Sequence, residues 1–560
     1  MNDVSGRPAH TRRRKEQMEY IKCDVLVAGG GAAGSRAALA AKTAGPRLRV
    51  MVVVDGVYES GGSTNMAASE ALGINAPFNY ADDGDSPEIF EKDILETGGG
   101  LADPALCRIV ARESGDRVRE LMDLGMVFFS RDGHPQAQKL SGCTKARSLT
   151  NGGSTGREMV RVLKKQALQK GVEIIEHLKI FSLFQDENGT VRGVYGMKDG
   201  KPVFIESGAV VLATGGAPSM FSVNVSAATQ TGDGWAMAYN AGCRFTNMEF
   251  FQCGPAVMNC GMKFIIHSHM WRFLPKLTNK EGKEFLSAYC TNGVSAQEAL
   301  DLKAMSYPFS VRTGAMYVDI AVYKEIMAGR CLPHGGISFD VTHIAKEDLL
   351  KKAPITYETL LKAGIDLAVE PLELGIAVQN FNGGVIIDEN GFTGVEGLYA
   401  AGEVTGGVHG SDRPGGNNLS DTQVFGYRAG RAASAFAETN RRRVQGPEIE
   451  TGNLAAGRDE ADIIRESEAL YYKEMTVIRH KAGIEKILDF IDQKGGKAVS
   501  VQLKNRLCVG RLLANAIRAR DESRGTHYRE DRPKTEESWR RRIVLVRGSD
   551  GLPREIKEKK

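Results

Sequence analysis

Short apolar runs that end in glycine-rich turns occur at three places far apart along the chain. The runs cover residues 25–27, 210–212 and 398–401, and the turns that follow them begin at Gly29, Gly215 and Gly402. A continuous apolar run bounded by glycine is typical of a parallel strand that is buried on both faces. We therefore predict an α/β fold in which three strand ends bring backbone close to one ligand.

The first of these turns precedes a predicted helix. Residues 32–44 are mostly small and favour a helix, and the turn before them carries G-x-G-x-x-G at Gly29, Gly31 and Gly34. These glycines allow a tight turn and a close approach to a pyrophosphate, while the helix start offers unpaired N–H groups. Asp55 ends the next apolar run and suits an adenosine ribose. The pattern predicts a bound dinucleotide without separating FAD from NAD; a glycine-rich turn without a ligand is the alternative.

In other segments the spacing of apolar residues predicts helices and a hairpin. Apolar residues at helical spacing predict amphipathic helices over 104–124 and 151–168, and alternation on both sides of 187–189 predicts a hairpin between 172 and 197. The Gly- and Ser-rich segment 59–75 suits close contact with a flat ligand, because its N–H and hydroxyl groups can bind ligand oxygens and nitrogens. A mobile surface loop is the alternative.

Length and charge narrow the class of protein. A chain of 560 residues is too long for one ordinary core, so two or three domains are expected, and no run of apolar residues is long enough for a membrane span. A net charge of +4 gives no reason to expect nucleic acid as a partner. Arg12–Lys15 form a basic cluster that resembles a twin-arginine signal but lacks a separate apolar segment. We expect a disordered basic tail over 1–20 and a cytoplasmic protein.

The cysteines do not predict a metal site. Nine are scattered along the chain and none forms C-x-x-C, so neither zinc nor an iron–sulfur cluster held by this chain alone is expected. An odd number of cysteines suits reduced thiols in a reducing compartment. Electrons that leave a bound flavin would therefore need another molecule as carrier.

Seven motifs, in order, resemble the flavoproteins of the succinate dehydrogenase, fumarate reductase and L-aspartate oxidase family. The resemblance runs from about residue 22 to 539. Its motifs are VAGGGAAGSRAALAA at 27, ATGG at 213, TGDGWAMAYNAG at 231, MEFFQ at 248, AAGE at 400, HGSDRPGGNNL at 409 and SRGTHYRED at 523. The resemblance implies a Rossmann-like FAD-binding domain from two segments, 21–243 and 375–440. It also implies an inserted α+β capping domain over 244–374 and a C-terminal helical domain over 455–560.

The resemblance also assigns residues to FAD. The implied cofactor-binding residues are Gly29, Gly31, Ala32, Ala33, Gly34, Asp55, Ser60, Gly62, Ser63, Thr64, Ala213, Thr214, Gly215, Asp233, Gly402, Glu403, Asn418 and Leu419. Respiratory members attach FAD to a histidine in the segment that matches 60–65. No histidine lies between Asp55 and His134 here, so non-covalent FAD is expected, which favours substrate reduction over oxidation.

Four residues are candidates for the chemistry. Reducing an activated C=C bond needs a proton donor and cations that hold a carboxylate, and arginine suits both tasks. By resemblance Arg413, with His409 beside it, holds the carboxylate, and Arg312 matches the proton donor; alternatively, Arg312 is a surface arginine of the cap. An ungapped count places His267 where relatives have an acidic proton relay, although a histidine packed in the core fits the sequence equally.

Two segments depart from the family pattern. Where dicarboxylate-handling members read Q-x-H-P-T, this chain reads Gln252, Cys253, Gly254, Pro255, Ala256, and Gln379 replaces another histidine. Plain fumarate or succinate is therefore not the expected substrate, and a monocarboxylate, a bulkier enoate, a CoA-linked acid and an aromatic compound stay open.

Three functions follow from these observations. The first is an FAD-dependent oxidoreductase that acts on a C–C or C=C bond next to a carboxyl or carbonyl of a small molecule. The second is another reaction on the same scaffold, such as that of aspartate oxidase or adenylylsulfate reductase. The third is a flavin electron-transfer subunit of a larger complex. An iron–sulfur or ferredoxin-like partner is expected for the electrons.

Overall fold

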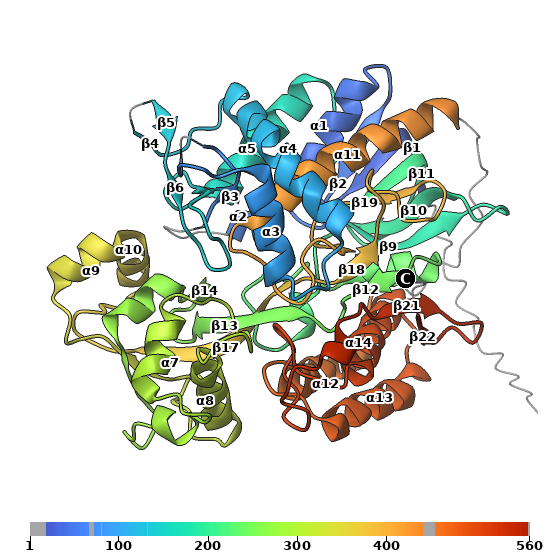
Figure 1. The fold of residues 1–560 in the computed structure, drawn as a ribbon. Helices are drawn as coiled ribbons and strands as arrows, with labels where there is room; N and C mark the ends of the chain where they lie inside the picture. Colours follow the sequence, from blue (N-terminus) through green and yellow to red (C-terminus); the bar gives the residue numbers. More distant parts are fainter. Residues whose placement is uncertain (1–17, 67–71, 80, 132, 441–453, 558–560) are drawn as a thin grey trace, which may run out of the picture.

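The computed structural model describes residues 18–66, 72–79, 81–131, 133–440 and 454–557. Its elements form three groups (Figure 1): a sheet covered by helices, an inserted sheet with its own helices, and a group of C-terminal helices. The basic cluster at 12–15 lies outside the described residues. Strand β1 already begins at Glu19, so it includes two residues of the predicted tail.

The main sheet has the strand order β8-β2-β1-β11-β10-β9, and β19 also pairs with β11. Its strands are β1 (Glu19–Ala28), β2 (Val50–Val53), β8 (Glu173–Ile175), β9 (Leu178–Gln185), β10 (Val191–Lys198), β11 (Lys201–Leu212) and β19 (Leu398–Ala400). Because β1 and β19 both pair with β11 in parallel, the three glycine turns lie at one edge of the sheet. The predicted α/β arrangement and the hairpin of β9 and β10 are confirmed.

Helices cover this sheet. They are α1 (Ala32–Ala44), α3 (Pro87–Thr97), α4 (Pro104–Asp123), α5 (Thr155–Gln169) and α11 (Asn417–Thr439). Helices α1 and α11 pack closely because α11 has glycine at the contact: a Cβ at Gly430 would lie 2.2 Å from the carbonyl oxygen of Ala37. Asp103 caps α4, accepting a hydrogen bond from the N–H of Ala105 at 3.0 Å. The predicted helices are therefore all present.

The inserted sheet is antiparallel, with the order β14-β13-β17-β16-β15. Its strands are β13 (Phe251–Val257), β14 (Phe264–Ile265), β15 (Lys276–Thr278), β16 (Ile337–Asp340) and β17 (Leu372–Phe381), and its helices are α7 (Ala296–Lys303), α8 (Met316–Met327), α9 (Lys346–Lys352) and α10 (Pro354–Lys362). In Figure 1, β13 and β17 run together between this group and the rest of the molecule. Strand β17 crosses the predicted domain boundary between 374 and 375, so both predicted domains share it.

The C-terminal group is not wholly helical. Helices α12 (Arg458–Met475), α13 (Lys481–Gly495) and α14 (Val501–Ala519) are followed by strands β21 (Val544–Arg547) and β22 (Pro553–Ile556). These strands extend a second sheet that contains β12 (Phe245–Thr246), β18 (Gly384–Ile386) and β20 (Thr405–Gly406). A fully buried ion pair between Arg520 and Glu249, 2.7 Å apart, also attaches this group to the residues before β13.

The remaining elements are short. They are α2 (Gly62–Met66), α6 (Asp233–Asn240), β3 (Ile74–Asn75), β4 (Ser130–Arg131), β5 (His134–Pro135), β6 (Ala137–Gln138), β7 (Ser148–Leu149), and the 3₁₀ helices at Pro218–Met220, Ser268–Phe273, Leu286–Ala288 and Glu537–Trp539. Within the described part of the chain, no helix combines the length and apolar character that crossing a membrane requires.

Candidate active site

A cavity of about 600 Å³ lies where the glycine turns of the main sheet face the inserted sheet. This volume lies within the range of about 300–1,000 Å³ that is typical of ligand sites. Residues from β1, β2, β9, α1, α2, α6, α11, β13 and β17 line it, together with the turn that follows β11. The cavity therefore joins segments that lie nearly 400 residues apart, and it has two ends of different chemistry.

The first end is built around the turn after β1. Gly29 has φ +111°, and a Cβ there would lie 2.2 Å from the carbonyl oxygen of Ala213. Gly31 is the N-cap of α1 and has no side chain to bond the helix start. The N–H of Ala32 points to Thr64 Oγ1 at 3.3 Å. Backbone N–H groups at a helix N-terminus that faces a cavity, with no N-cap side chain over them, are suited to bind a phosphate group.

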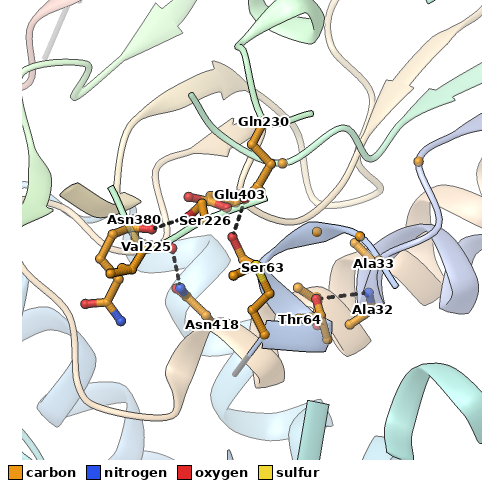
Figure 2. A pocket seen from close by; sticks show the side chains of 18 of the residues that line it. Ala32, Ala33, Ser63, Thr64, Val225, Ser226, Gln230, Asn380, Glu403 and Asn418 are labelled. Atoms are coloured by element: carbon orange, nitrogen blue, oxygen red, sulfur yellow. Dashed lines mark hydrogen bonds between the residues drawn. The ribbon is translucent and has the colours of Figure 1, made fainter. Parts of the chain in front are cut away.

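Polar side chains from separate segments meet along the middle of the cavity (Figure 2). Ser63 Oγ donates to Gln230 Oε1 at 2.7 Å, and Asn418 Nδ2 donates to Asn380 Oδ1 at 2.6 Å. Glu403 accepts a hydrogen bond from the N–H of Phe381 at 3.1 Å. Burial raises the pKa of Glu403 to about 7, which leaves the carboxyl partly protonated near neutral pH. This stretch can donate and accept hydrogen bonds along an extended ligand.

Two carboxylates lie at the far side of this end. Lys179 Nζ lies 3.8 Å from Asp55 Oδ2 and 3.3 Å from Asp233 Oδ2. Asn505 Nδ2 donates to Asp233 Oδ1 at 2.9 Å. Burial is the largest effect on Asp55 and raises the pKa of its carboxyl, while Lys179 opposes this rise. Asp55 follows β2 and borders the cavity, as a ribose-binding residue would.

Most predicted cofactor residues border the cavity. The described lining includes Gly29, Gly31, Ala32, Ala33, Asp55, Gly62, Ser63, Thr64, Ala213, Thr214, Gly215, Asp233, Glu403, Asn418 and Leu419.

Three predicted residues lie beside that lining. A Cβ at Gly34 would lie 1.9 Å from the carbonyl oxygen of Gly29, so Gly34 serves the close packing of helix on strand. A Cβ at Gly402 would lie 2.7 Å from the Cβ of Ala33. The Ser60 hydroxyl donates to the carbonyl of Val57 at 2.9 Å, so it is already engaged in a local hydrogen bond.

Arg413 dominates the second end of the cavity. Its guanidinium borders the cavity, and its Nε is buried without a hydrogen-bond partner among the described residues. Burial lowers the pKa of Arg413 to about 10, which still leaves it charged at neutral pH. The preceding Asp412 accepts hydrogen bonds from the Arg413 N–H at 2.9 Å and from Gln252 Nε2 at 3.3 Å. The charged guanidinium of Arg413, whose Nε–H has no described hydrogen-bond partner, is suited to bind an anionic ligand.

Arg312 and His409 lie outside the cavity lining. Arg312 Nη1 is 3.6 Å from Asp412 Oδ2, and 42% of its side chain is exposed. His409 Nε2 lies 3.3 Å from Asp421 Oδ2 and its Nδ1 lies 3.3 Å from Asn417 Nδ2, so it contacts the N-terminal part of α11. Arg312 shares a carboxylate with the Arg413 loop, whereas His409 contacts α11 and is not itself in the cavity lining.

His267 does border the cavity. Burial and the nearby His269 lower the pKa of His267 to about 3, so its imidazole is uncharged at neutral pH. Its ring centroid lies 5.1 Å from that of Tyr307. His267 therefore adds no positive charge to this end.

The sequence analysis missed Tyr307. Its hydroxyl is buried without a partner among the described residues, and the residue borders the cavity. A tyrosine before a proline in an irregular segment carries no motif, and its position depends on contacts with β13. Sequence spacing therefore offered no signal for it.

The first end fits FAD. The glycine at position 29 leaves open a space that a Cβ would fill, and the N-cap residue of α1 has no side chain. Together with the carboxylate that follows β2, these features are suited to a dinucleotide. Thr214 Oγ1 is also buried at this end, without a hydrogen-bond partner among the described residues. The described residues contain no cluster of His, Cys, Asp or Glu that could hold a metal ion.

Comparisons with known proteins identify the family of the chain. The family described as FAD binding domain matches residues 24–419, and the family described as fumarate reductase flavoprotein C-term matches residues 496–558. One subunit of the fumarate reductase (CoM/CoB) of Methanothermobacter marburgensis is 32% identical, over 95% of this chain and 98% of the relative. The L-aspartate oxidase of Streptomyces coelicolor is 29% identical, over 94% of this chain and 91% of the relative.

A solved structure has the same fold. The structure of Mycobacterium smegmatis Sdh1 in complex with UQ1 matches with a TM-score of 0.82 at 29% identity, over 96% of this chain and 94% of that chain. The predicted family, fold and cofactor are thereby confirmed. The chain belongs to the FAD binding domain family, and it is an FAD-dependent oxidoreductase of the succinate dehydrogenase, fumarate reductase and L-aspartate oxidase flavoprotein type.

Proposed function

We propose that this protein reduces a C=C bond next to a carboxyl or carbonyl group, with FAD bound non-covalently. In this reaction one alkene carbon gains a hydride and its neighbour gains a proton, so two electrons must come from a donor. FAD supplies the hydride chemistry when it is bound. The absence of histidine between Asp55 and His134 supports non-covalent binding.

The observation that carries this proposal is the state of Arg413. Its guanidinium is charged, borders the cavity and has a buried Nε without a partner among the described residues. A carboxylate bound there would gain charge-assisted hydrogen bonds, and the cation would stabilise negative charge as it develops during reduction. Arg413 is therefore the proposed carboxylate-binding residue.

Other residues receive supporting roles. Arg312 is proposed as the proton donor, because it shares Asp412 with the Arg413 loop, whereas His267 is uncharged and a weak acid. His409 is proposed to position the start of α11 through Asp421. The predicted FAD-binding residues that border the cavity are proposed to hold the cofactor.

A protein partner is proposed for the electrons. The relative from Methanothermobacter marburgensis is named as one subunit of its enzyme, which supports a complex with at least one further chain. The proposed carrier of the electrons is an iron–sulfur or ferredoxin-like protein. We propose that the partner is such a protein in the cytoplasm.

A reoxidation assay tests the function. Yellow protein reduced anaerobically with a viologen dye would be mixed with enoates, fumarate, adenylylsulfate or oxygen. We expect enoates to reoxidise it, and Arg413→Gln to lower kcat/KM by about 100- to 1,000-fold. Arg428→Gln is the control, because Arg428 pairs with Glu113 away from the cavity. If no acceptor reoxidises the flavin, the result would favour an electron-transfer subunit. Unchanged activity of Arg413→Gln would overturn the proposed site.

Acid precipitation tests the attachment of the cofactor. Non-covalent FAD should appear in the supernatant after the protein is denatured. Yellow colour that stays with the precipitate would contradict this part of the proposal.

A further inference from the structure

Tyr307 reaches the substrate end of the cavity from the segment that follows α7. The N–H of Phe309 donates to the carbonyl of Cys253 at 2.8 Å, so this segment lies directly beside β13. The Tyr307 hydroxyl is buried without a partner among the described residues, and the residue borders the cavity. A buried hydroxyl of this kind normally has a hydrogen-bond partner.

Gly254 creates the space for this hydroxyl. A Cβ at Gly254 would lie 2.7 Å from Tyr307 Oη, closer than real Cβ atoms approach. By the resemblance described above, relatives have a histidine at the position of Gly254. Here the Tyr307 hydroxyl, from another segment, occupies the place that a side chain at position 254 would take.

Tyr307 remains protonated at physiological pH. Burial is the main cause that raises the pKa of its phenol, and Asp319 adds to the rise. The hydroxyl can therefore donate a hydrogen bond without carrying charge.

Two glutamines that border the same cavity are also neutral, and their side-chain oxygens lack hydrogen-bond partners among the described residues. Gln252 on β13 pairs with Asn380, whereas Cys253 pairs with Val378, so Gln379 is an extra residue on β17. Such an irregularity can redirect a side chain, and here both Gln379 and Asn380 border the cavity. Gln252 Oε1 and Gln379 Oε1 are buried without described partners.

Among the basic residues that border the cavity in the described part of the chain, Arg413 is the one with a buried N–H that has no hydrogen-bond partner. The ammonium of Lys263 also borders the cavity, but it donates to Asn224 Oδ1 at 2.7 Å and to the carbonyl of Ser226 at 2.5 Å. His267 is uncharged. This distribution suits one carboxylate and disfavours a second, which would be buried beside neutral groups.

We propose that Tyr307, Gln252 and Gln379 bind a neutral amide group of a substrate whose single carboxylate binds Arg413. The amide carbonyl accepts from the Tyr307 hydroxyl, and the amide N–H donates to a glutamine oxygen. The substrate class is therefore an unsaturated monocarboxylate with an amide at the other end of its C=C bond. This inference rests on the proposed function and specifies its substrate.

Ligand binding to the oxidised holoenzyme tests the inference without turnover. Fumaric acid monoamide, monomethyl fumarate and fumarate would be titrated while the flavin absorbance is recorded. We expect the monoamide to bind most tightly and fumarate least tightly. Tyr307→Phe should weaken the monoamide by about tenfold and fumarate much less. Gly254→Ala should have the same selective effect, because its Cβ displaces the hydroxyl.

Tyr195→Phe is the matched control. The Tyr195 hydroxyl is likewise buried without a described partner, but it lies on β10 away from the cavity lining. Equal FAD content and melting temperature in both variants would show that the protein folds. Tighter binding of fumarate, or equal monoamide affinity in Tyr307→Phe and the wild type, overturns this inference alone. Failure of all three ligands to bind overturns it together with the proposed function.

Discussion

The two ends of the cavity are built in different ways. The cofactor end consists mainly of backbone and small side chains at strand ends, with a glycine turn and a bare helix start. The substrate end consists of long side chains from β13, β17, the segment after α7 and the Arg413 loop. At the first end a short local pattern shapes the site, while at the second end distant segments must meet.

This difference separates a site fixed by backbone from a site that side chains can adjust. No residue with a side chain fits at position 29, since a Cβ there would overlap the carbonyl of Ala213. At the substrate end, a position without a side chain, such as Gly254, leaves space that a side chain from another segment, such as Tyr307, can fill. Substrate preference can therefore change while the cofactor stays the same.

Breaking a buried ion pair in the inserted group of elements should have the largest effect on the free energy of unfolding. Lys303 and Asp319 form a fully buried ion pair, 2.6 Å apart, on helices of the inserted group. Lys303→Met leaves the carboxylate buried and unpaired, so the free energy of unfolding should fall by about 3–5 kcal/mol in urea titrations followed by circular dichroism. FAD content of the folded fraction should be unchanged. The half-exposed pair of Lys324 and Glu530 is the control: Lys324→Met should cost less than about 1 kcal/mol, and equal losses would contradict the expectation.

At the cofactor end, Gly29→Ala should weaken FAD binding by about 100-fold or more. The new Cβ would overlap backbone at Ala213, which cannot move independently of the sheet. Titration of apoprotein with FAD, followed by flavin fluorescence, measures the affinity. Gly56→Ala separates overlap from backbone strain, because Gly56 has φ +113° but nothing within 4 Å of its Cβ position. Similar losses in both variants would exclude overlap as the cause.

Glu403 should make the apoprotein more stable as the pH falls. Its pKa is about 7 in the folded protein, above its ordinary value of 4.5, so the folded state binds more protons between these values. The free energy of unfolding should therefore decrease as the pH rises from 4.5 to 7, by up to about 1.4 kcal/mol per pH unit from this group. Glu403→Gln should reduce that slope in urea titrations at several pH values. An unchanged slope would show that the carboxyl titrates normally.

The smallest expected effect distinguishes two neighbouring serines. Ser63→Ala removes a hydrogen bond to Gln230 at the cavity and should weaken FAD binding by about fivefold, equivalent to about 1 kcal/mol. Ser60→Ala should leave the affinity unchanged, because Ser60 is not part of the cavity lining and its hydroxyl is engaged by the carbonyl of Val57. FAD titrations of both apoproteins measure this difference. A larger loss for Ser60→Ala would reverse the assignment of the two serines.

Local sequence was sufficient for the cofactor end. The strand, the glycine turn and the helix over 32–44 are consecutive, and each depends on interactions between near neighbours, so the helix was predicted with its observed limits. The boundary at 374/375 was less accurate, because β17 continues through it while pairing with β13, more than 100 residues away in sequence.

At the substrate end, the sequence by itself determined which charged residues were available, including Arg413, and that the family's histidines were missing. Only the tertiary structure decided that Arg312 pairs with Asp412, that Gln379 is an extra residue on its strand, and that Tyr307 faces the space left by Gly254. The physical reason is that a strand pattern depends on neighbouring residues, whereas a side chain's partner depends on which distant segments pack against it.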